Sequence, residues 1–312
     1  MSEPRLAYNL VDVFTFSPYA GNVAGVVMDA EGLNEKQMLL ITRELGAPAT
    51  AFILPATTKE AAARLRWFSQ GGELSFCGHG TLASAHVLFE CLRGSQDPAA
   101  PAAALPIECR AGIVSVRADS HPVAGKPPTI WLDMPHCEPK SGQVFLPPWV
   151  ERLGLSMKDI DPRIPAIRTQ DDDIIFAVRE LQTLLTLAPA SADLARHSRK
   201  EGIRGFLVTT TQAISSATVV QSRFFAPSIG IEEDPVTGSV HGPLGFHLVK
   251  SGVVPLVGGK ADFLCAQGKS GGRAGVVRIA VSQSAAGEQA VRIGGSCVTT
   301  AAGIIHHLPP VE

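Results

Sequence analysis

The 312-residue sequence is poor in charge, since Asp, Glu, Lys and Arg make up 18% of it, against about 25% in an average soluble domain. Its 27 basic and 29 acidic residues leave a net charge of −2, and the basic residues form no run. The electrostatic footprint of a nucleic-acid or acidic-membrane partner is therefore missing. No stretch of about 18 apolar residues occurs without a charge or a turn residue, so the sequence predicts no membrane span.

Several chemical signatures are also missing. The six cysteines are scattered without a C-x-x-C pair, which indicates reduced thiols rather than a disulfide framework or a zinc site. The first residues lack the basic-then-apolar order of a signal peptide, and together these features predict a cytoplasmic protein without a metal. There is no Walker loop and no G-x-S-x-G, and the G-x-G-x-x-A segment at Gly78–Ala83 follows a polar loop where a dinucleotide site needs a strand.

Glycine and proline are abundant, with 30 and 23 residues, which predicts short strands with tight turns in an α+β fold rather than a helical bundle. Three helices stand out. One begins after Asn34, with Gln37 as a capping-box partner, and runs to about Leu45. Apolar helices are expected over 78–93 and about 238–249, and Pro243 should kink or shorten the start of the second.

The two apolar helices belong to a diverged internal repeat. Arg66-Trp67-Phe68 and Cys77-Gly78-His79 precede the first, and Arg223-Phe224-Phe225 and Thr237-Gly238-Ser239 precede the second; later, Ala111–Val114 is echoed by Ala274–Val277. Three matches in one order indicate a duplication. We therefore expect two similar α+β lobes, each a curved sheet around one apolar helix, with the two helix starts facing one cleft. The Pro/Gly-rich stretch 121–128 is the predicted boundary between them.

The two glycine-led helix starts are candidates for an anion site. Bare N–H groups and the positive end of the helix dipole favour an anion there. Gly78 with His79, and Gly238 with Ser239, would together bind one substrate carboxylate. Simple capping by Thr237, with glycine tolerated at a tight turn, explains the same pattern equally well.

Three side chains are candidates for proton transfer. The helix dipole favours a neutral imidazole at His79, which suits a proton relay, although a histidine held by a backbone carbonyl is an equal alternative. Glu44 stands at a helix end, where a carboxylate is disfavoured by about 0.3–1 kcal/mol, and an apolar setting would favour its protonated form. An exposed glutamate is the plainer interpretation. Asp234 belongs to the acidic turn 232–234, in which one carboxylate is expected to point inward.

Long motifs in a fixed order give this chain a resemblance to the phenazine-biosynthesis PhzF-like family. The segments are VDVFTFSPYAGNVAGVV (11–27), RELGAPATAFIL (43–54), RWFSQGGELSFCGHGTLASAHVLFE (66–90), GIEEDPVTGSVHGPLGFHL (230–248), AQGKSGGRAGVV (266–277) and VRIGGSCVTTAAG (291–303). The resemblance implies a diaminopimelate-epimerase-like fold with two pseudo-symmetric lobes, each a barrel-like, mostly antiparallel sheet around a central helix. It also implies a homodimer with the active site between the lobes. We expect the N-terminal lobe to contain residues 1–121, with the segment from about 298 to 312 returning to it, and the C-terminal lobe to contain residues 128–297.

The resemblance also implies roles for individual residues. Glu44 matches the family's catalytic acid/base, and His79, Asp234 and Ser239 match its supporting catalytic residues. Gly78, Gly238, Thr237 and Cys77 are the expected substrate-binding residues. The best-known family reaction isomerises a dihydro-hydroxyanthranilate, without a cofactor, by moving a hydrogen between ring carbons. Here Gly46–Thr50 stands where the family has an N-L-S-E-T run, so we expect an isomerase acting on a different small carboxylate.

Cys77 supports an alternative function. Related two-base racemases and epimerases carry a cysteine before the glycine of each helix start, but here the second position is Thr237, whose hydroxyl is no comparable base near neutral pH. Symmetric racemisation is therefore disfavoured, while a Cys77-dependent racemase or dehydratase of an amino acid or hydroxyproline-type acid stays open. Cys77 as an inert buried residue, and the whole chain as a non-catalytic binding or scaffold protein, are the remaining alternatives.

Overall fold

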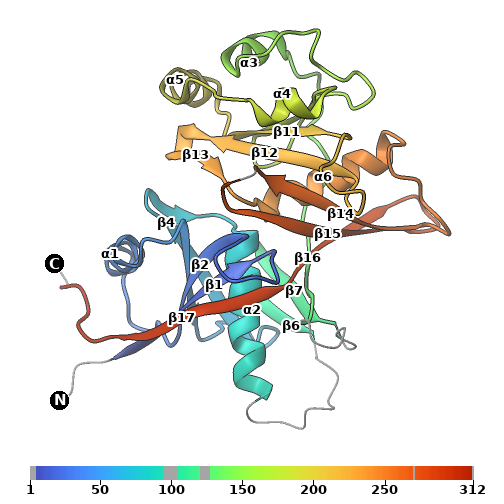
Figure 1. Ribbon diagram of the computed structural model, residues 1–312. Helices are drawn as coiled ribbons and strands as arrows, with labels where there is room; N and C mark the ends of the chain where they lie inside the picture. Colours follow the sequence, from blue (N-terminus) through green and yellow to red (C-terminus); the bar gives the residue numbers. More distant parts are fainter. Residues whose placement is uncertain (1–4, 94–103, 120–126, 270, 311–312) are drawn as a thin grey trace. The chain divides into compact units, whose positions relative to one another are not determined.

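The chain folds into two compact units. The computed structural model describes residues 5–93, 104–119, 127–269 and 271–310 (Figure 1). The N-terminal unit contains Met1–Asp133 and Gly294–Glu312, and the C-terminal unit contains Met134–Ile293. The first unit boundary lies shortly after the stretch 121–128 that the sequence indicates, of which residues 121–126 are outside the described part.

The N-terminal unit is a mixed sheet with two helices. Strand β1 pairs antiparallel with β2 and β17, β2 pairs parallel with β3, and β3 pairs antiparallel with β4. Strand β4 pairs antiparallel with β5 and parallel with β6, and β6, β7 and β8 follow as an antiparallel series. The elements are β1 (Leu6–Val13), β2 (Asn22–Val27), α1 (Glu35–Leu45), β3 (Ala49–Leu54), β4 (Ala63–Ser69), β5 (Gly72–Leu74), α2 (Gly78–Arg93), β6 (Leu105–Cys109), β7 (Gly112–Ala118), β8 (Ile130–Asp133) and β17 (Cys297–Ile305).

The C-terminal unit repeats this plan and adds short helices. Its elements are α3 (Pro147–Arg152), β9 (Ile167–Arg168), β10 (Asp173–Ala177), α4 (Leu181–Leu185), α5 (Ser191–Glu201), β11 (Gly205–Thr210), β12 (Val220–Ala226), η1 (Pro227–Ile229), β13 (Ile231–Asp234), α6 (Gly238–Lys250), β14 (Lys260–Gly268), β15 (Ala274–Gln283) and β16 (Gln289–Gly295). Strand β10 pairs antiparallel with β9 and parallel with β11, and β11 pairs antiparallel with β12. Strand β12 pairs antiparallel with β13 and parallel with β14, which pairs antiparallel with β15. The order and sense of pairing are those of β1 to β7.

Side-chain contacts recur with the strand order. Arg66 on β4 makes a bidentate ion pair with Glu73 and lies over the ring of Phe68, with 5.2 Å between guanidinium carbon and ring centroid. Arg223 on β12 makes the same bidentate pair with Glu233 and lies 4.9 Å over the Phe225 ring. A shared register and a shared ion pair support the duplication that the repeat indicates. The mixed α+β class expected from the sequence is confirmed.

Two apolar helices occupy the interior of the units. In the N-terminal unit α2 packs against β1, β2, β3, β7, β8 and β17 (Figure 1). In the C-terminal unit every residue of α6 from Gly238 to Leu248 is buried. A side chain at Gly245 would place its Cβ 2.5 Å from Ile279 Cγ2, so glycine lets α6 lie against β15.

The expectation that Pro243 shortens the second apolar helix is wrong. Helix α6 begins at Gly238 and continues through Pro243 to Lys250. The local consequence is instead a missing donor, because proline has no N–H for the carbonyl of Ser239, four residues earlier. The helix is nevertheless maintained by the packing of its buried residues, Gly238 to Leu248.

The capping prediction for α1 is confirmed, whereas α5 was missed. The Asn34 side chain accepts from the Gln37 N–H at 2.9 Å, and the Gln37 side chain accepts from the Asn34 N–H. Helix α5 has no side-chain cap and buries only Leu194, Ala195 and Ser198. The few apolar residues of α5 recur with helical spacing, but the segment is polar overall and lacks the capping signal that marks the start of α1.

The two equivalent arginines should differ in their contribution to stability. Arg223 is 2% exposed and also donates to the carbonyls of Leu184 and Leu187, whereas Arg66 is 24% exposed. Removing one partner of a buried ion pair costs about 3–5 kcal/mol, against about 1 kcal/mol or less near the surface. Arg223→Met should therefore lower the free energy of unfolding by about 3 kcal/mol, and Arg66→Met by much less, in denaturant titrations. Equal losses would contradict this account.

Candidate functional site

The start of α2 brings Cys77 and His79 together. Cys77 is 5% exposed, and its Sγ lies 3.6 Å from His79 Nδ1. The Cys77 carbonyl accepts from the backbone N–H of Thr81 at 2.9 Å and from its hydroxyl at 2.7 Å, which closes the first helical turn. Gly80 is needed here, because a Cβ would lie 2.8 Å from Trp67 Cδ1. Gly78, Cys77 and His79 thus form what we call the N-terminal half-site.

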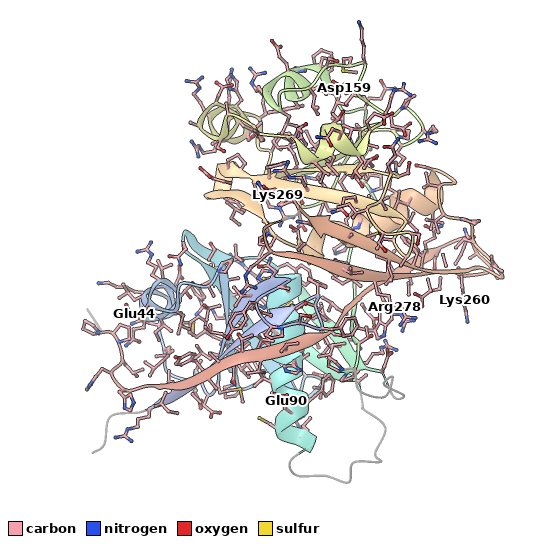
Figure 2. The ribbon with its side chains drawn as sticks, in the orientation of Figure 1. Glu44, Glu90, Asp159, Lys260, Lys269 and Arg278 are labelled. Atoms are coloured by element: carbon pink, nitrogen blue, oxygen red, sulfur yellow. The ribbon has the colours of Figure 1, made fainter. Side chains whose placement is uncertain are left out.

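Glu44 belongs to the same unit but stands apart in its contacts. It lies in the last turn of α1, where Figure 2 labels it, just before Gly46, which ends the helix with φ of 67°. Its side chain is exposed, so the apolar setting expected for it is wrong, and the plainer interpretation of an exposed glutamate describes its environment. Among the described residues, no hydrogen bond or ion pair joins Glu44 to the N-terminal half-site. Its catalytic role remains a prediction.

The acidic turn before α6 directs one carboxylate inward. Asp234, at the end of β13, is 6% exposed, and its Oδ2 accepts from the Thr237 hydroxyl at 2.5 Å. Glu233 instead pairs with Arg223 and with Lys269, which Figure 2 labels, while Glu232 is exposed. Asp234, Thr237, Gly238 and Ser239 therefore lie together in what we call the C-terminal half-site.

Gln267 on β14 organises this half-site, and sequence reasoning missed it. The side chain is fully buried; its Oε1 accepts from the Thr237 N–H at 3.0 Å, and its Nε2 donates to the Asp234 carbonyl at 2.7 Å. The Thr237 hydroxyl makes no capping bond to α6; it donates its hydrogen to Asp234, and its oxygen accepts from Gln267 Nε2 at 3.1 Å. Simple capping by Thr237 is therefore wrong. The available signal was the matched segment 266–277, which contains Gln267.

Arg204 is a second residue that sequence reasoning missed. Its Nη2 donates to Ser239 Oγ at 3.2 Å, and its guanidinium makes a bidentate pair with the buried carboxylate of Asp173 on β10. Burial alone would lower the pKa of Arg204, but attraction to Asp173 and the hydrogen bonds to it raise that pKa, so the cation persists. Because Ser239 Oγ accepts from Arg204, its hydroxyl hydrogen remains to be donated. The acidic run 171–173 was the sequence signal for a buried counter-cation.

His241 is buried one turn beyond Thr237. Its Nδ1 lies 2.7 Å from the Thr237 carbonyl, so Nδ1 carries the proton and donates, while Nε2 has no partner among the described residues. Burial lowers the pKa of His241 to about 4, with the bond to Thr237 acting against it. The imidazole is therefore neutral at pH 7 and holds the first turn of α6 as a hydrogen-bond donor.

Equivalent positions of the two units carry different chemistry. When the two repeats are aligned at the starts of α2 and α6, Cys77 corresponds to Thr237 and His79 corresponds to Ser239. Helices α1 and α5 both end at a left-handed glycine, Gly46 and Gly202, so Glu44 corresponds to Lys200. The thiol, imidazole and carboxylate all belong to the N-terminal unit, whereas the matching positions of the C-terminal unit hold hydroxyls and an ammonium.

Neither a metal cluster nor a spanning helix is found in the part of the chain that the structure describes. No group of three or more His, Cys, Asp or Glu side chains there is arranged to hold a metal ion. Likewise, no described helix has the length and apolar character needed to cross a membrane.

The buried His241 should make stability depend on pH. Its pKa of about 4 in the folded chain lies below the ordinary value of about 6.5, so the unfolded chain binds more protons between these values. Stability is therefore full above about pH 6.5 and falls by about 3 kcal/mol as pH drops towards 4. Denaturant titrations of His241→Gln should show a shallower fall than the parent. His197→Gln, at a side chain 33% exposed, should keep the parent slope; identical slopes in both variants and the parent would refute the role of His241.

Comparisons with known proteins identify the family to which this chain is similar. The family model described as "Phenazine biosynthesis-like protein" (PhzC-PhzF) matches residues 11–303. The chain is 32% identical to the "uncharacterized isomerase YddE" of Escherichia coli K12 over 290 residues, covering 92% of this chain and 94% of the relative. It is 30% identical over 304 residues to an "uncharacterized isomerase" of Deinococcus radiodurans, covering 96% and 95%.

Solved structures show the same fold. A phenazine biosynthesis protein of the PhzF family from Bacillus anthracis superposes with a TM-score of 0.82 at 24% identity, covering 97% of this chain and 99% of that one. A hydroxyproline epimerase from Agrobacterium vitis, solved with bound trans-4-hydroxy-L-proline, shares the fold with a TM-score of 0.63 at 16% identity, covering 98% and 94%. The family match over residues 11–303, the identity to curated isomerases over nearly the whole length and the shared fold lead to one conclusion: this chain belongs to the phenazine biosynthesis-like (PhzC-PhzF) family of isomerase-like proteins.

Proposed function

We propose that this protein is a cofactor-independent isomerase that moves a proton between two carbons of a small carboxylate-bearing molecule. The observation that carries the proposal is the unequal chemistry of the two equivalent half-sites. At the equivalent positions the N-terminal unit holds a thiol, an imidazole and a carboxylate, while the C-terminal unit holds two hydroxyls and an ammonium; the Asp234 carboxylate of the C-terminal half-site accepts from the Thr237 hydroxyl. Such a division suits one acid/base acting on a substrate held by its anionic group.

The C-terminal half-site is suited to the substrate carboxylate. Arg204 donates to Ser239 Oγ, so the Ser239 hydroxyl is free to donate its hydrogen to a carboxylate oxygen. The first backbone N–H groups of α6, beginning at Gly238, have no partner within the helix and add to this donor set. Asp234 acts through Thr237, whose hydroxyl it fixes.

The N-terminal half-site is suited to the reacting carbons. In the proposed reaction the Glu44 carboxylate removes a proton from one carbon, the double bond shifts, and the resulting carboxylic acid returns the proton to another carbon. The oxidation state of the substrate does not change overall, so the step needs no electron acceptor. His79 orients the substrate or supports the charge that develops on it, and Gly78 contributes a donor at the start of α2.

Both half-sites serve one substrate in this proposal. The resemblance to the family implies this arrangement, together with two barrel-like lobes and a homodimer. The substrate differs from a dihydro-hydroxyanthranilate, because the run after Glu44 supplies no polar side chain until Thr50. Ala47 and Ala49 are buried, and Gly46 is in the left-handed region.

A second candidate function is a Cys77-dependent racemase or dehydratase of an amino acid or hydroxyproline-type acid. The observation in its favour is the Cys77 Sγ at 3.6 Å from the His79 imidazole, which is placed to accept the thiol proton. The observation against it is Thr237, whose hydroxyl is occupied by Asp234 and provides no second thiol. A non-catalytic binding protein is the third possibility.

Deuterium incorporation distinguishes these functions. The protein is incubated in D₂O with pools of small carboxylic acids, and mass spectrometry follows both deuterium uptake and product formation. Glu44→Gln should reduce turnover by about 100-fold or more, because a positioned acid/base contributes about 10²–10⁴ in rate. Glu90→Gln is the matched control, since it makes the same change at a glutamate that is 55% exposed on α2 (Figure 2).

Each outcome assigns one function. Turnover that survives Glu44→Gln unchanged would sink the proposed role of Glu44. Loss on Cys77→Ala, with ligand protection of Cys77 from alkylation, would favour the second candidate. A folded protein that converts no acid in a broad panel, with Glu44→Gln leaving its ligand binding unchanged, would favour the binding protein.

A further inference from the structure

The N-terminal unit contains a pocket that none of the expected site residues lines. Strand β4 pairs with β5 through Trp67–Ser69 and with β6 through Ala63 and Arg64. Between these pairings the edge of β4 is open at Leu65 and Arg66. A pocket of about 340 Å³ lies at this gap. Its volume lies within the range of about 300–1,000 Å³ that is typical of small-molecule sites.

The pocket contains more cationic groups than its carboxylates can neutralise. Three arginines and two glutamates line it. Glu73 is held by Arg66 at 2.7 and 2.8 Å. Glu108 accepts from the N–H of Thr57 at 2.7 Å and from its hydroxyl at 2.5 Å. These bonds lower the pKa of both carboxyls, so both are ionised at neutral pH and both already have partners.

Two guanidinium groups in the same pocket, of the half-buried Arg64 and the exposed Arg110, attract Glu73 at longer range but make no such direct bond. Among the described residues, no hydrogen bond or ion pair reaches Arg64 or Arg110, and the Nε of Arg64 is buried without an acceptor. A buried, unpaired donor on a cation is costly. A bound oxyanion would satisfy it, because guanidinium groups match carboxylate and phosphate geometry.

Apolar side chains form the rest of the pocket. Leu65, Leu74 and Cys109 line it together with Trp67, which is 1% exposed and whose indole Nε1 has no partner among the described residues. Leu65, Trp67 and Cys109 are buried, whereas Leu74 is partly exposed, and an oxyanion alone would leave the apolar surface of Leu74 without a contact. The combination of an arginine pair with an apolar wall fits an anion that carries a small hydrophobic body.

The repeat explains why the pocket exists in this unit. Ala63 pairs with Ile107 and Val220 pairs with Cys265, so Cys109 and Gln267 occupy equivalent positions two residues later. In the C-terminal unit the long Gln267 side chain is buried and hydrogen-bonded to Thr237. The shorter Cys109 cannot reach as far and leaves space. The fold therefore does not require the opening, since its other copy fills the equivalent position.

We propose that this pocket binds a small organic anion whose carboxylate or phosphate group lies between Arg64 and Arg110 and whose apolar body packs against Leu74, the strand neighbour of Trp67. The site is separate from the proposed catalytic function and does not depend on it. Trp67 nevertheless connects the two regions, because its ring also packs beside Gly80 of α2.

The indole signals of the three tryptophans provide the first test. Because the Trp67 ring also lies beside Gly80, a Trp67 shift is assigned to the pocket only where the arginine variants weaken it. The full-length ¹⁵N-labelled protein is titrated with benzoate, with phenyl phosphate and with inorganic phosphate at millimolar concentration. The Trp67 indole cross-peak, assigned with Trp67→Phe, should shift and saturate, while those of Trp131 and Trp149 stay in place. Response to benzoate or to phenyl phosphate identifies the anionic group, and a weaker response to inorganic phosphate shows the contribution of the apolar body.

Variants then locate the binding energy. Arg64→Gln combined with Arg110→Gln should weaken binding at least about tenfold, since a hydrogen bond to a charged group contributes about 1.5–3 kcal/mol. Cys109→Gln should block binding with every arginine retained. Arg196→Gln, at a side chain 73% exposed in the other unit, is the matched control and should bind as the parent does. No Trp67 shift with any probe, or unchanged affinity in the folded double arginine variant, would overturn the proposal.

Discussion

The start of a buried helix is the constraint on which the rest of this structure depends. The first backbone N–H groups of a helix have no partner within it, and in α6 the start is buried together with the helix body. The Gln267 side chain accepts a hydrogen bond from the Thr237 N–H, and Asp234 accepts one from the Thr237 hydroxyl. Arg204 donates a hydrogen bond to Ser239 Oγ. Side chains from three different strands or loops are thus needed to make one helix start stable and at the same time suited to an anion.

The repeat contains two such helix starts, at α2 and at α6, and different side chains surround each of them. The skeleton is preserved to the level of a bidentate arginine–glutamate pair and the aromatic ring beneath it. At the helix starts, however, a thiol and an imidazole in one unit correspond to two hydroxyls in the other. A repeated scaffold keeps its packing while its functional side chains diverge, because packing involves many positions and chemistry depends on a few.

The low charge content makes the existing ion pairs informative. Asp173 is buried and bound to the partly buried Arg204, and Arg223 is almost fully buried against Glu233. Charges in such places are retained only with good partners. In the N-terminal pocket, by contrast, the half-buried Arg64 has a buried Nε without an acceptor among the described residues, and the proposed anion would supply that acceptor.

The sequence by itself determined the α+β class, the capping box of α1, the two apolar helices, the repeat and the family. Each of these predictions depends on local periodicity or on contiguous motifs, which can be read from neighbouring positions along the chain. Only the tertiary structure placed Arg204 beside Ser239, Gln267 beneath Thr237, and a pocket where Cys109 replaces the longer glutamine. These contacts join residues about 30 or more positions apart, so they depend on strand register and on which neighbour fills a space. The tertiary structure also decided that Glu44 is exposed and that the weakly apolar α5 is a helix, because burial is a property of the assembled unit and not of the segment.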